Sequence, residues 1–448
     1  MKKAKKFLAS FLACAAVCAV SVTALAATPL ETRTAETKSY LSAMNQKDGG
    51  LDEWGLIGLA ASGVSGDSDT VKGIITTALT DISKNGFTGT AGSYGESAWG
   101  SNAGNLAKLI LFLNSQGISP YTFGENGDFK GYDLVSALFN TGHYYNNVSA
   151  YDVPFALMVY DALGISAAEE ATYKYSREDL VKKCLGLIGT VNALSSGIPG
   201  GVDGMTGVPN TFDTTGKAPY DFESTAMVLQ ALAPYYTGSK TVSDPAVTAE
   251  ITTKVNGCVD SIKQLQTTTG GISYAFFNYD ADWNASFAKY ADSSDAMSQI
   301  ILAFTALGID IDTVSNGGDS MLDNFLSAEY QTGTAGEFRA NADPLTAYYS
   351  TYYSTKYAYM ALVAYSEMTN NGEAFSLFDR ATPVAYTDYD YSFFYPASTP
   401  DTEEPETEKP AVKDPVKTGD AFPAAGAALV LIFCGASLFW LKKAKAGR

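Results

Sequence analysis

The chain has 448 residues, of which 46% are hydrophobic, and it carries a formal net charge of −18. This length and apolar content allow one large buried core or two ordinary ones. The acidic excess would repel phosphate backbones, which argues against nucleic acid as a partner. One histidine and five cysteines also argue against a structural zinc site, which normally gathers four Cys or His ligands, and no metal site is predicted.

Residues 1–26 have the pattern of a secretory signal peptide. Four lysines at positions 2 to 6 precede an apolar run over residues 7–22, and Ala24-Leu25-Ala26 forms a small-x-small cleavage site. We therefore expect the chain to be exported. Cys184 and Cys258 are the two cysteines between this signal and the C-terminal anchor described below. They exclude a disulfide-dense scaffold and leave open whether the two pair.

From residue 27 to about 380, Gly-rich turns alternate with helical patterns, and no long alternating strand pattern occurs. Six segments dense in small and aliphatic residues are apolar on nearly all sides, which is typical of buried helices. More polar, amphipathic segments run between them, such as 70–82, 176–188 and 249–265. The six buried segments are predicted at 54–63, 106–113, 151–163, 221–232, 294–307 and 354–362.

The alternation of buried and half-exposed helices predicts an all-α domain over residues 27–395. Six repeats of such a pair favour an (α/α)6 toroid, in which two helical rings are concentric. Acids and hydroxyls suit the N-terminal ends of the inner helices, and these ends would gather at one mouth of the toroid. The candidate ligand-binding residues at that mouth are Trp54, Tyr151, Asp152, Asp221, Glu223, Asp295 and Tyr357.

The C-terminal part of the chain predicts a stalk and an anchor. Residues 396–420 are rich in Pro, Glu and Thr, which indicates an extended stalk. Residues 421–441 carry no charge and are long enough for a transmembrane helix. The basic residues within 442–448 predict a cytoplasmic tail, so the rest of the chain would face outward.

The end of the stalk resembles the sortase signal of Gram-positive surface proteins. Lys417-Thr418-Gly419-Asp420 matches that signal, whereas Pro415 and Val416 stand where the family has a Leu-Pro pair. The resemblance implies cleavage between Thr418 and Gly419 and attachment to the cell wall. A simple membrane anchor is the alternative, and both place the protein on the extracellular face of a Gram-positive cell.

The helical region, over roughly residues 35–370, resembles the terpenoid cyclase and protein prenyltransferase superfamily. The resemblance lies in the Gln266-x-x-x-Gly270-Gly271 turn and in the helix starts Ser-Thr-Ala-Met at 224–227 and Ser-Asp-Ala-Met at 294–297. The chain is most similar to secreted bacterial members and to the vitamin B12 carriers of the transcobalamin group. The resemblance implies a toroid of six helix pairs, and it makes a corrinoid one candidate ligand. No cofactor is predicted.

The enzymatic motifs of the superfamily are not intact. Class II cyclases carry Asp-x-Asp-Asp-Thr-Ala, whose middle aspartate protonates the substrate. Here the segment 221–226 reads Asp-Phe-Glu-Ser-Thr-Ala, so Glu223 stands at the proton donor and Ser224 replaces the next aspartate. His143 lacks the Asp-x-Cys pair of a prenyltransferase zinc site. Cys258 lacks the glutamine that a complement-type thioester needs.

We therefore expect a non-catalytic toroid that binds an extracellular small molecule, such as a corrinoid, or a glycan. One alternative is an enzyme, either a divergent cyclase that uses Glu223 as its acid or a polysaccharide-acting enzyme that uses paired carboxylates. Another is an adhesion or protein-interaction module. An enzyme would need two or more carboxylates facing one closed cavity, with a raised pKa on at least one of them.

Overall fold

The computed structural model describes residues 27–45, 51–87, 99–127, 129–145, 149–211, 213, 215–279, 285–341, 351–378 and 385–395. The predicted signal peptide (1–26), stalk (396–420), Thr418–Gly419 bond, transmembrane helix (421–441) and basic tail (442–448) all lie outside these residues. Within the described ranges, no helix is both long and apolar enough to cross a membrane.

The described chain is mainly helical, which confirms the predicted class. All six predicted apolar segments and all three amphipathic ones lie in helices. The prediction that the helices form two concentric rings stays a prediction. The α-helices are α2 (Pro29–Asn45), α3 (Glu53–Ala61), α4 (Ser68–Asn85), α5 (Ala103–Ser115), α6 (Leu134–Asn140), α7 (Val153–Ala162), α8 (Ala167–Glu170), α9 (Arg177–Leu187), α10 (Phe222–Thr237), α11 (Pro245–Gln264), α12 (Ser294–Ala306), α13 (Met321–Phe325) and α14 (Thr351–Asn371).

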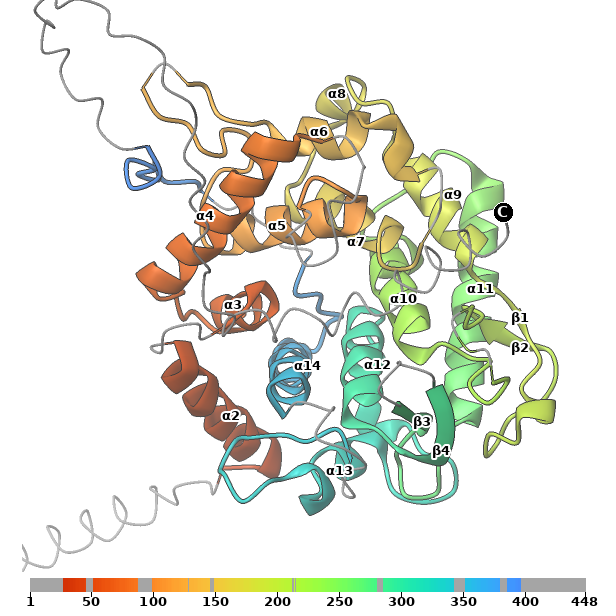
Figure 1. Cartoon of the computed structure of the whole chain (residues 1–448). Helices are drawn as coiled ribbons and strands as arrows, with labels where there is room; N and C mark the ends of the chain where they lie inside the picture. Colours follow the sequence, from red (N-terminus) through yellow and green to blue (C-terminus); the bar gives the residue numbers. More distant parts are fainter. Residues whose placement is uncertain are drawn as a thin grey trace, which may run out of the picture.

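Six of the described helices contact one another in a closed cycle. Along the chain, α3 contacts α5, α5 contacts α7, α7 contacts α10, α10 contacts α12 and α12 contacts α14, which returns to contact α3. Figure 1 shows these helices around the centre of the view. Because their sequences are apolar almost all round, packing on several sides is what removes their surface from water.

Further helices lie on the outer side of this cycle in Figure 1 and contact it through one face. Helix α2 contacts α14 and α3, α9 contacts α7 and α10, and α11 contacts α10. Cys184 of α9 and Cys258 of α11 are both buried free thiols, so no disulfide joins them. Burial raises the pKa of Cys258 to about 12, which keeps it as an unreactive thiol.

Two short antiparallel strand pairs interrupt the helices, and the sequence pattern did not predict them. The pairs are β1 (Gly189–Val191) with β2 (Met205–Gly207), and β3 (Ser273–Tyr279) with β4 (Ala285–Asp292). The second pair forms just before α12. Its strands are rich in aromatic residues, which favour strands. They show no regular alternation, because Phe276 and Phe277 are adjacent and Lys289 precedes Tyr290, so the sequence pattern did not mark them.

The beginnings of the six helices lie at one end of the cycle. Contacts between adjacent helix starts establish this. The backbone N–H of Gly104 in α5 donates to Asp152 Oδ1 before α7 at 2.9 Å, and Tyr352 Oη in α14 donates to Asp52 Oδ1 before α3 at 2.8 Å. Conversely, the last residues of α3, α10, α12 and α14 line one common cavity. The six helices therefore run parallel.

The contact between α5 and α7 gives a test of this packing. A Cβ at Gly104 would collide with the Tyr151 backbone carbonyl, whereas a Cβ at Gly73 on the exposed side of α4 would meet nothing within 4 Å. We expect Gly104→Ala to lower the free energy of unfolding by about 1–3 kcal/mol. Gly73→Ala should raise it by about 0.5–1 kcal/mol, because alanine is the better helix former. Urea unfolding followed by circular dichroism measures both, and equal effects of the two substitutions would contradict the packing.

Candidate functional site

Three predicted acids, Asp221, Glu223 and Asp295, come together where α10 and α12 begin. Asp221 is the N-cap of α10 and accepts hydrogen bonds from the backbone N–H (2.9 Å) and the hydroxyl (2.6 Å) of Ser224. Glu223 lies in the first turn of the same helix, and Asp295 lies in the first turn of α12. All three side chains are half-buried, so solvent still reaches a group of acids held between packed helices.

Burial shifts the protonation of these acids. It raises the pKa of Glu223 to about 8, and the negative charges of Asp221 and Asp295 add to the effect. Burial also raises the pKa of Asp295 to about 6, although Ser354, Lys356 and Ser294 oppose the rise. The pKa of Asp221 is raised by burial as well, against the hydrogen bonds from Ser224. At neutral pH the Glu223 carboxyl therefore mostly holds its proton.

Two predicted tyrosines border these acids from α7 and α14. Tyr151 lies close enough to Asp221 and Glu223 for their charges, together with burial, to raise its phenol pKa. The pKa of Tyr357 is raised by burial and by several acids, including Asp52, Glu223 and Asp295. Phenol groups that stay protonated at neutral pH can donate hydrogen bonds to a ligand.

Asp152 lies at the edge of this group. Its carboxylate does not cap α7. It accepts the Gly104 backbone N–H instead, and burial raises its pKa. We therefore interpret this hydrogen bond as structural, because it holds the start of α5 against the start of α7.

An ion pair that sequence reasoning missed joins the start of α3 to α14. Lys356 Nζ contacts Asp52 Oδ2, and the Lys356 side chain is fully buried, whereas the Asp52 side chain is 32% exposed. Asp52 also caps α3 by accepting the Gly55 backbone N–H at 3.0 Å. Burial opposes both charges and lowers the pKa of Lys356. The lysine and the hydrogen bonds to Asp52 outweigh burial there and hold the Asp52 pKa below its usual range. A lysine in an otherwise apolar helix was the available sequence signal, because a buried charge needs a partner.

Three tyrosine rings enclose the Lys356 ammonium. Its nitrogen lies 4.1 Å from the ring centroid of Tyr353, 5.0 Å from that of Tyr357 and 5.1 Å from that of Tyr352. These distances are typical of cation–π contacts. Tyr357 thus faces both the buried ammonium and the acids of α10 and α12, and it links the ion pair to the acidic group.

Two buried polar atoms beside this group have no hydrogen-bond partner within the described part of the chain. They are Asp295 Oδ1 and Ser354 Oγ, and the Ser354 side chain is 0% exposed. Ser354 is near enough to lower the pKa of Asp295, but the two are not in hydrogen-bonding geometry. Buried polar atoms are rarely left unpaired, so these two indicate a place where a further group can be accommodated. We use the name acidic site for Asp221, Glu223, Asp295, Ser354, Tyr151 and Tyr357.

Trp54, the remaining predicted residue, packs apart from these acids. It is 8% exposed, and its ring centroid lies 5.2 Å from that of Phe155 and 6.1 Å from that of Phe378. Phe378 belongs to the segment that follows α14. The three rings therefore form an aromatic cluster between α3, α7 and the C-terminal segment, and Trp54 contributes packing there.

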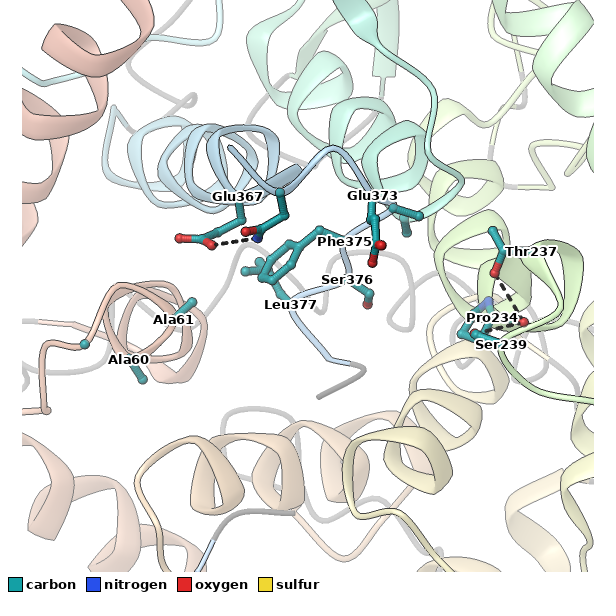
Figure 2. Close-up of a pocket in the computed structure, with 14 residues that line it drawn as sticks. Ala60, Ala61, Pro234, Thr237, Ser239, Glu367, Glu373, Phe375, Ser376 and Leu377 are labelled. Atoms are coloured by element: carbon teal, nitrogen blue, oxygen red, sulfur yellow. Dashed lines mark hydrogen bonds between the residues drawn. The ribbon is translucent and has the colours of Figure 1, made fainter. Parts of the chain in front are cut away.

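The opposite end of the cycle holds a cavity of about 730 Å³ that the C-terminal segment partly fills. Figure 2 shows Phe375 and Leu377 from this segment between the ends of α3, α10 and α14. The Phe375 backbone N–H donates to the Thr305 carbonyl at 3.0 Å, which ties the segment to the end of α12. Since α12 has 13 residues, this cavity lies about 20 Å from the acidic site along the helix axis.

Among the residues that the structure describes, no group of three or more His, Cys, Asp or Glu side chains has the spacing to hold a metal ion. Residues 280–284, which include two further aspartates, lie outside the described residues.

The raised pKa of Glu223 predicts a pH-dependent stability. The folded protein keeps a proton on Glu223 up to about pH 8, whereas the unfolded chain releases it near the usual value of 4.5. Because the folded state binds more protons in this window, stability should fall as pH rises from 5 to 8. Glu223→Gln should make the loss of unfolding free energy between pH 5 and pH 8 smaller by about 1–3 kcal/mol. The effect is limited to this size because solvent partly screens the half-buried group.

Urea unfolding of the wild type and Glu223→Gln at several pH values measures the difference. Glu367→Gln, at the opposite end of the cycle, is the control and should keep the wild-type pH profile. Parallel profiles for the wild type and Glu223→Gln between pH 5 and pH 9 would contradict the prediction.

The ion pair predicts strong coupling between Asp52 and Lys356. Lys356→Met should cost about 2–4 kcal/mol of stability, because it leaves the Asp52 carboxylate without its cation. Asp52→Asn in the same chain should recover at least about 1 kcal/mol of that loss, since the amide can still cap α3. The exposed pair Glu178–Lys182, at 2.8 Å, is a matched control whose coupling should be much weaker than that of Asp52 and Lys356, because solvent screens exposed charges. Additive effects at Asp52 and Lys356 in chemical denaturation would refute the coupling.

The chain was compared with models of protein families and with curated proteins, and neither comparison found a match. The superfamily resemblance therefore rests on the turn and helix-start residues of the sequence. What the acidic site does must be argued from its own chemistry.

Proposed function

We propose that this chain is an exported surface protein of a Gram-positive bacterium, and that its helical domain is an (α/α)6 toroid that binds a small extracellular ligand. The ligand would occupy the acidic site. The observation that carries the proposal is the convergence of half-buried acids and tyrosines from α7, α10, α12 and α14 at one end of the helix cycle.

The toroid is supported by the closed cycle of contacts from α3 to α14 and by the outer positions of α2, α9 and α11. Parallel inner helices are also what a toroid requires, because every inner helix returns through an outer one. The ordering of the contacts along the chain, each helix against the next, supports the same architecture.

The position of the C-terminal segment supports ligand entry from one end of the helix cycle only. Residues 373–377 lie at the ends of the inner helices, and Phe378 reaches the aromatic cluster with Trp54 and Phe155. A ligand would therefore approach the acidic site from the end where the helices begin. Export and anchoring rest on the sequence patterns at 1–26 and 415–448.

A second candidate is an enzyme in which Glu223 donates a proton, and one observation favours it. Glu223 has a pKa of about 8 and lies beside two further carboxyls, Asp221 and Asp295. A carboxylic acid that is protonated at neutral pH next to an ionised one is the arrangement used for general acid–base work. A polysaccharide or an isoprenoid alkene would be a substrate for such an acid.

One screen tests both proposals. The purified protein is incubated with corrinoids, glycans and prenyl compounds, and its thermal unfolding and the composition of each mixture are followed. A ligand at about 100 times its Kd should stabilise the protein by about 2.7 kcal/mol. Asp295→Asn should abolish the shift, and Glu367→Gln at the opposite end should keep it.

The binding and enzymatic functions differ in what happens to the compound. A binding protein stabilises without changing the compound, whereas an enzyme consumes it and loses turnover in Glu223→Gln. A shift that survives Asp295→Asn but is lost in Glu367→Gln would place the ligand at the wrong end and sink the proposal. The absence of any shift across the three compound classes would count against a small-ligand function and favour an adhesion role.

A further inference from the structure

The acidic site contains more negative charge than the described residues around it balance. Asp221, Glu223 and Asp295 supply three carboxyls. The nearby cations are engaged elsewhere, because Lys356 contacts Asp52 and Lys108 lies 3.4 Å from Glu53. The charge of Lys356 also acts on Asp295 and lowers its pKa, but burial outweighs that effect. A group of carboxyls in this position takes up protons unless another cation arrives.

The unpaired atoms at the site call for a partner as well. Asp295 Oδ1 is a buried acceptor without a donor, and the fully buried Ser354 hydroxyl is unpaired beside it. A protein rarely leaves such atoms unsatisfied without a function, since each costs about 1–3 kcal/mol. The carboxylate oxygen of Asp295 requires a hydrogen-bond donor or a positive charge.

The chain itself shows how an ammonium is held in these surroundings. Lys356 Nζ is fully buried and is stabilised by one carboxylate, Asp52, and by three tyrosine rings. The acidic site next to it repeats these components with Asp295, Glu223, Tyr151 and the shared ring of Tyr357. In the second set, Asp295 Oδ1 has no hydrogen-bond partner among the described residues.

We propose that the ligand of the acidic site is an organic cation, a protonated or quaternary alkylammonium group, held by Asp295 and Glu223 and bordered by Tyr151 and Tyr357. This inference rests on the proposed function and names its ligand class. A neutral sugar would satisfy hydrogen bonds but would leave the carboxyls without a counter-charge. An anionic ligand would add to the repulsion.

Cation binding should be coupled to proton release. Glu223 is faced by Asp221 on its own helix, Tyr151 before α7, Asp295 on α12 and Tyr357 on α14, and Lys356 lies behind Tyr357. Asp221 and Asp295 favour the protonated form of Glu223, and an incoming cation favours the ionised form. The ligand and the proton therefore compete, and affinity for a cation should rise with pH.

The test measures binding of choline and spermidine to the full-length protein by isothermal titration calorimetry. The uncharged isostere of choline, 3,3-dimethylbutan-1-ol, is the matched control ligand. We expect choline or spermidine to bind at least about tenfold more tightly than the isostere. We expect Asp295→Asn and Glu223→Gln each to weaken binding by about tenfold or more, because each removes a counter-charge. Glu367→Gln should leave the affinity unchanged.

The pH series separates charge pairing from general loss of structure. In the wild type, affinity should rise by about tenfold or more between pH 6 and pH 8, as Glu223 loses its proton. In Glu223→Gln the same series should be nearly flat, and circular dichroism should show the wild-type helix content.

Three results would overturn the inference. The first is that the isostere binds as tightly as choline. The second is that neither choline nor spermidine binds. The third is that calcium ions bind on their own and displace choline and spermidine. If cellobiose binds instead and Asp295→Asn abolishes that binding, the ligand class is wrong and the proposed function stands. If neither the cations nor cellobiose bind, the inference fails, and the proposed function fails with it only if corrinoids and prenyl compounds also give no thermal shift.

Discussion

The contact between Asp52 and Lys356 is the interaction on which the rest of this structure depends. It joins the start of the first helix of the contact cycle to the last helix, across 304 residues of sequence. Tyr352 reinforces it by accepting the Asp52 backbone N–H and donating to its carboxylate, both at 2.8 Å. The same lysine orients the tyrosines of α14, one of which borders the acidic site. The same group of side chains therefore joins the first and last helices of the contact cycle and borders the acidic site.

Two of the acids at the helix starts cap a helix and also carry a partly buried negative charge. Asp52 and Asp221 are N-caps, so their carboxylates satisfy backbone N–H groups that a helix leaves unpaired. The positive end of the helix dipole also favours a negative charge there. Helix capping therefore offsets part of the cost of holding acids half-buried. Glu223 and Asp295 lie within the first turn but are not N-caps, and they are the two acids whose pKa values rise most clearly toward neutrality.

The sequence predicted the helices well because the six helices of the cycle are apolar almost all round, and α3, α5, α10 and α12 start with a capping side chain. It also predicted that Asp221, Glu223, Asp295, Tyr151 and Tyr357 belong near one end, since caps mark the end of a helix and the helices repeat. It could not predict that Trp54 packs on Phe378, because that contact depends on where the chain goes after α14. Lys356 was missed for a related reason. Its partner, Asp52, precedes α3, and no local pattern connects two residues so far apart.

The cycle of helices has a consequence for the order in which the protein folds. The start of α3 and the first turns of α14 become neighbours only after about 300 intervening residues have been made, and closing such a loop costs entropy on the order of 5 kcal/mol. Folds dominated by such distant contacts form slowly. During synthesis, the apolar surface of α3 that contacts α14 stays exposed until α14 has been made. The interval before that last contact is when the unfinished molecule is most exposed to proteolysis and aggregation.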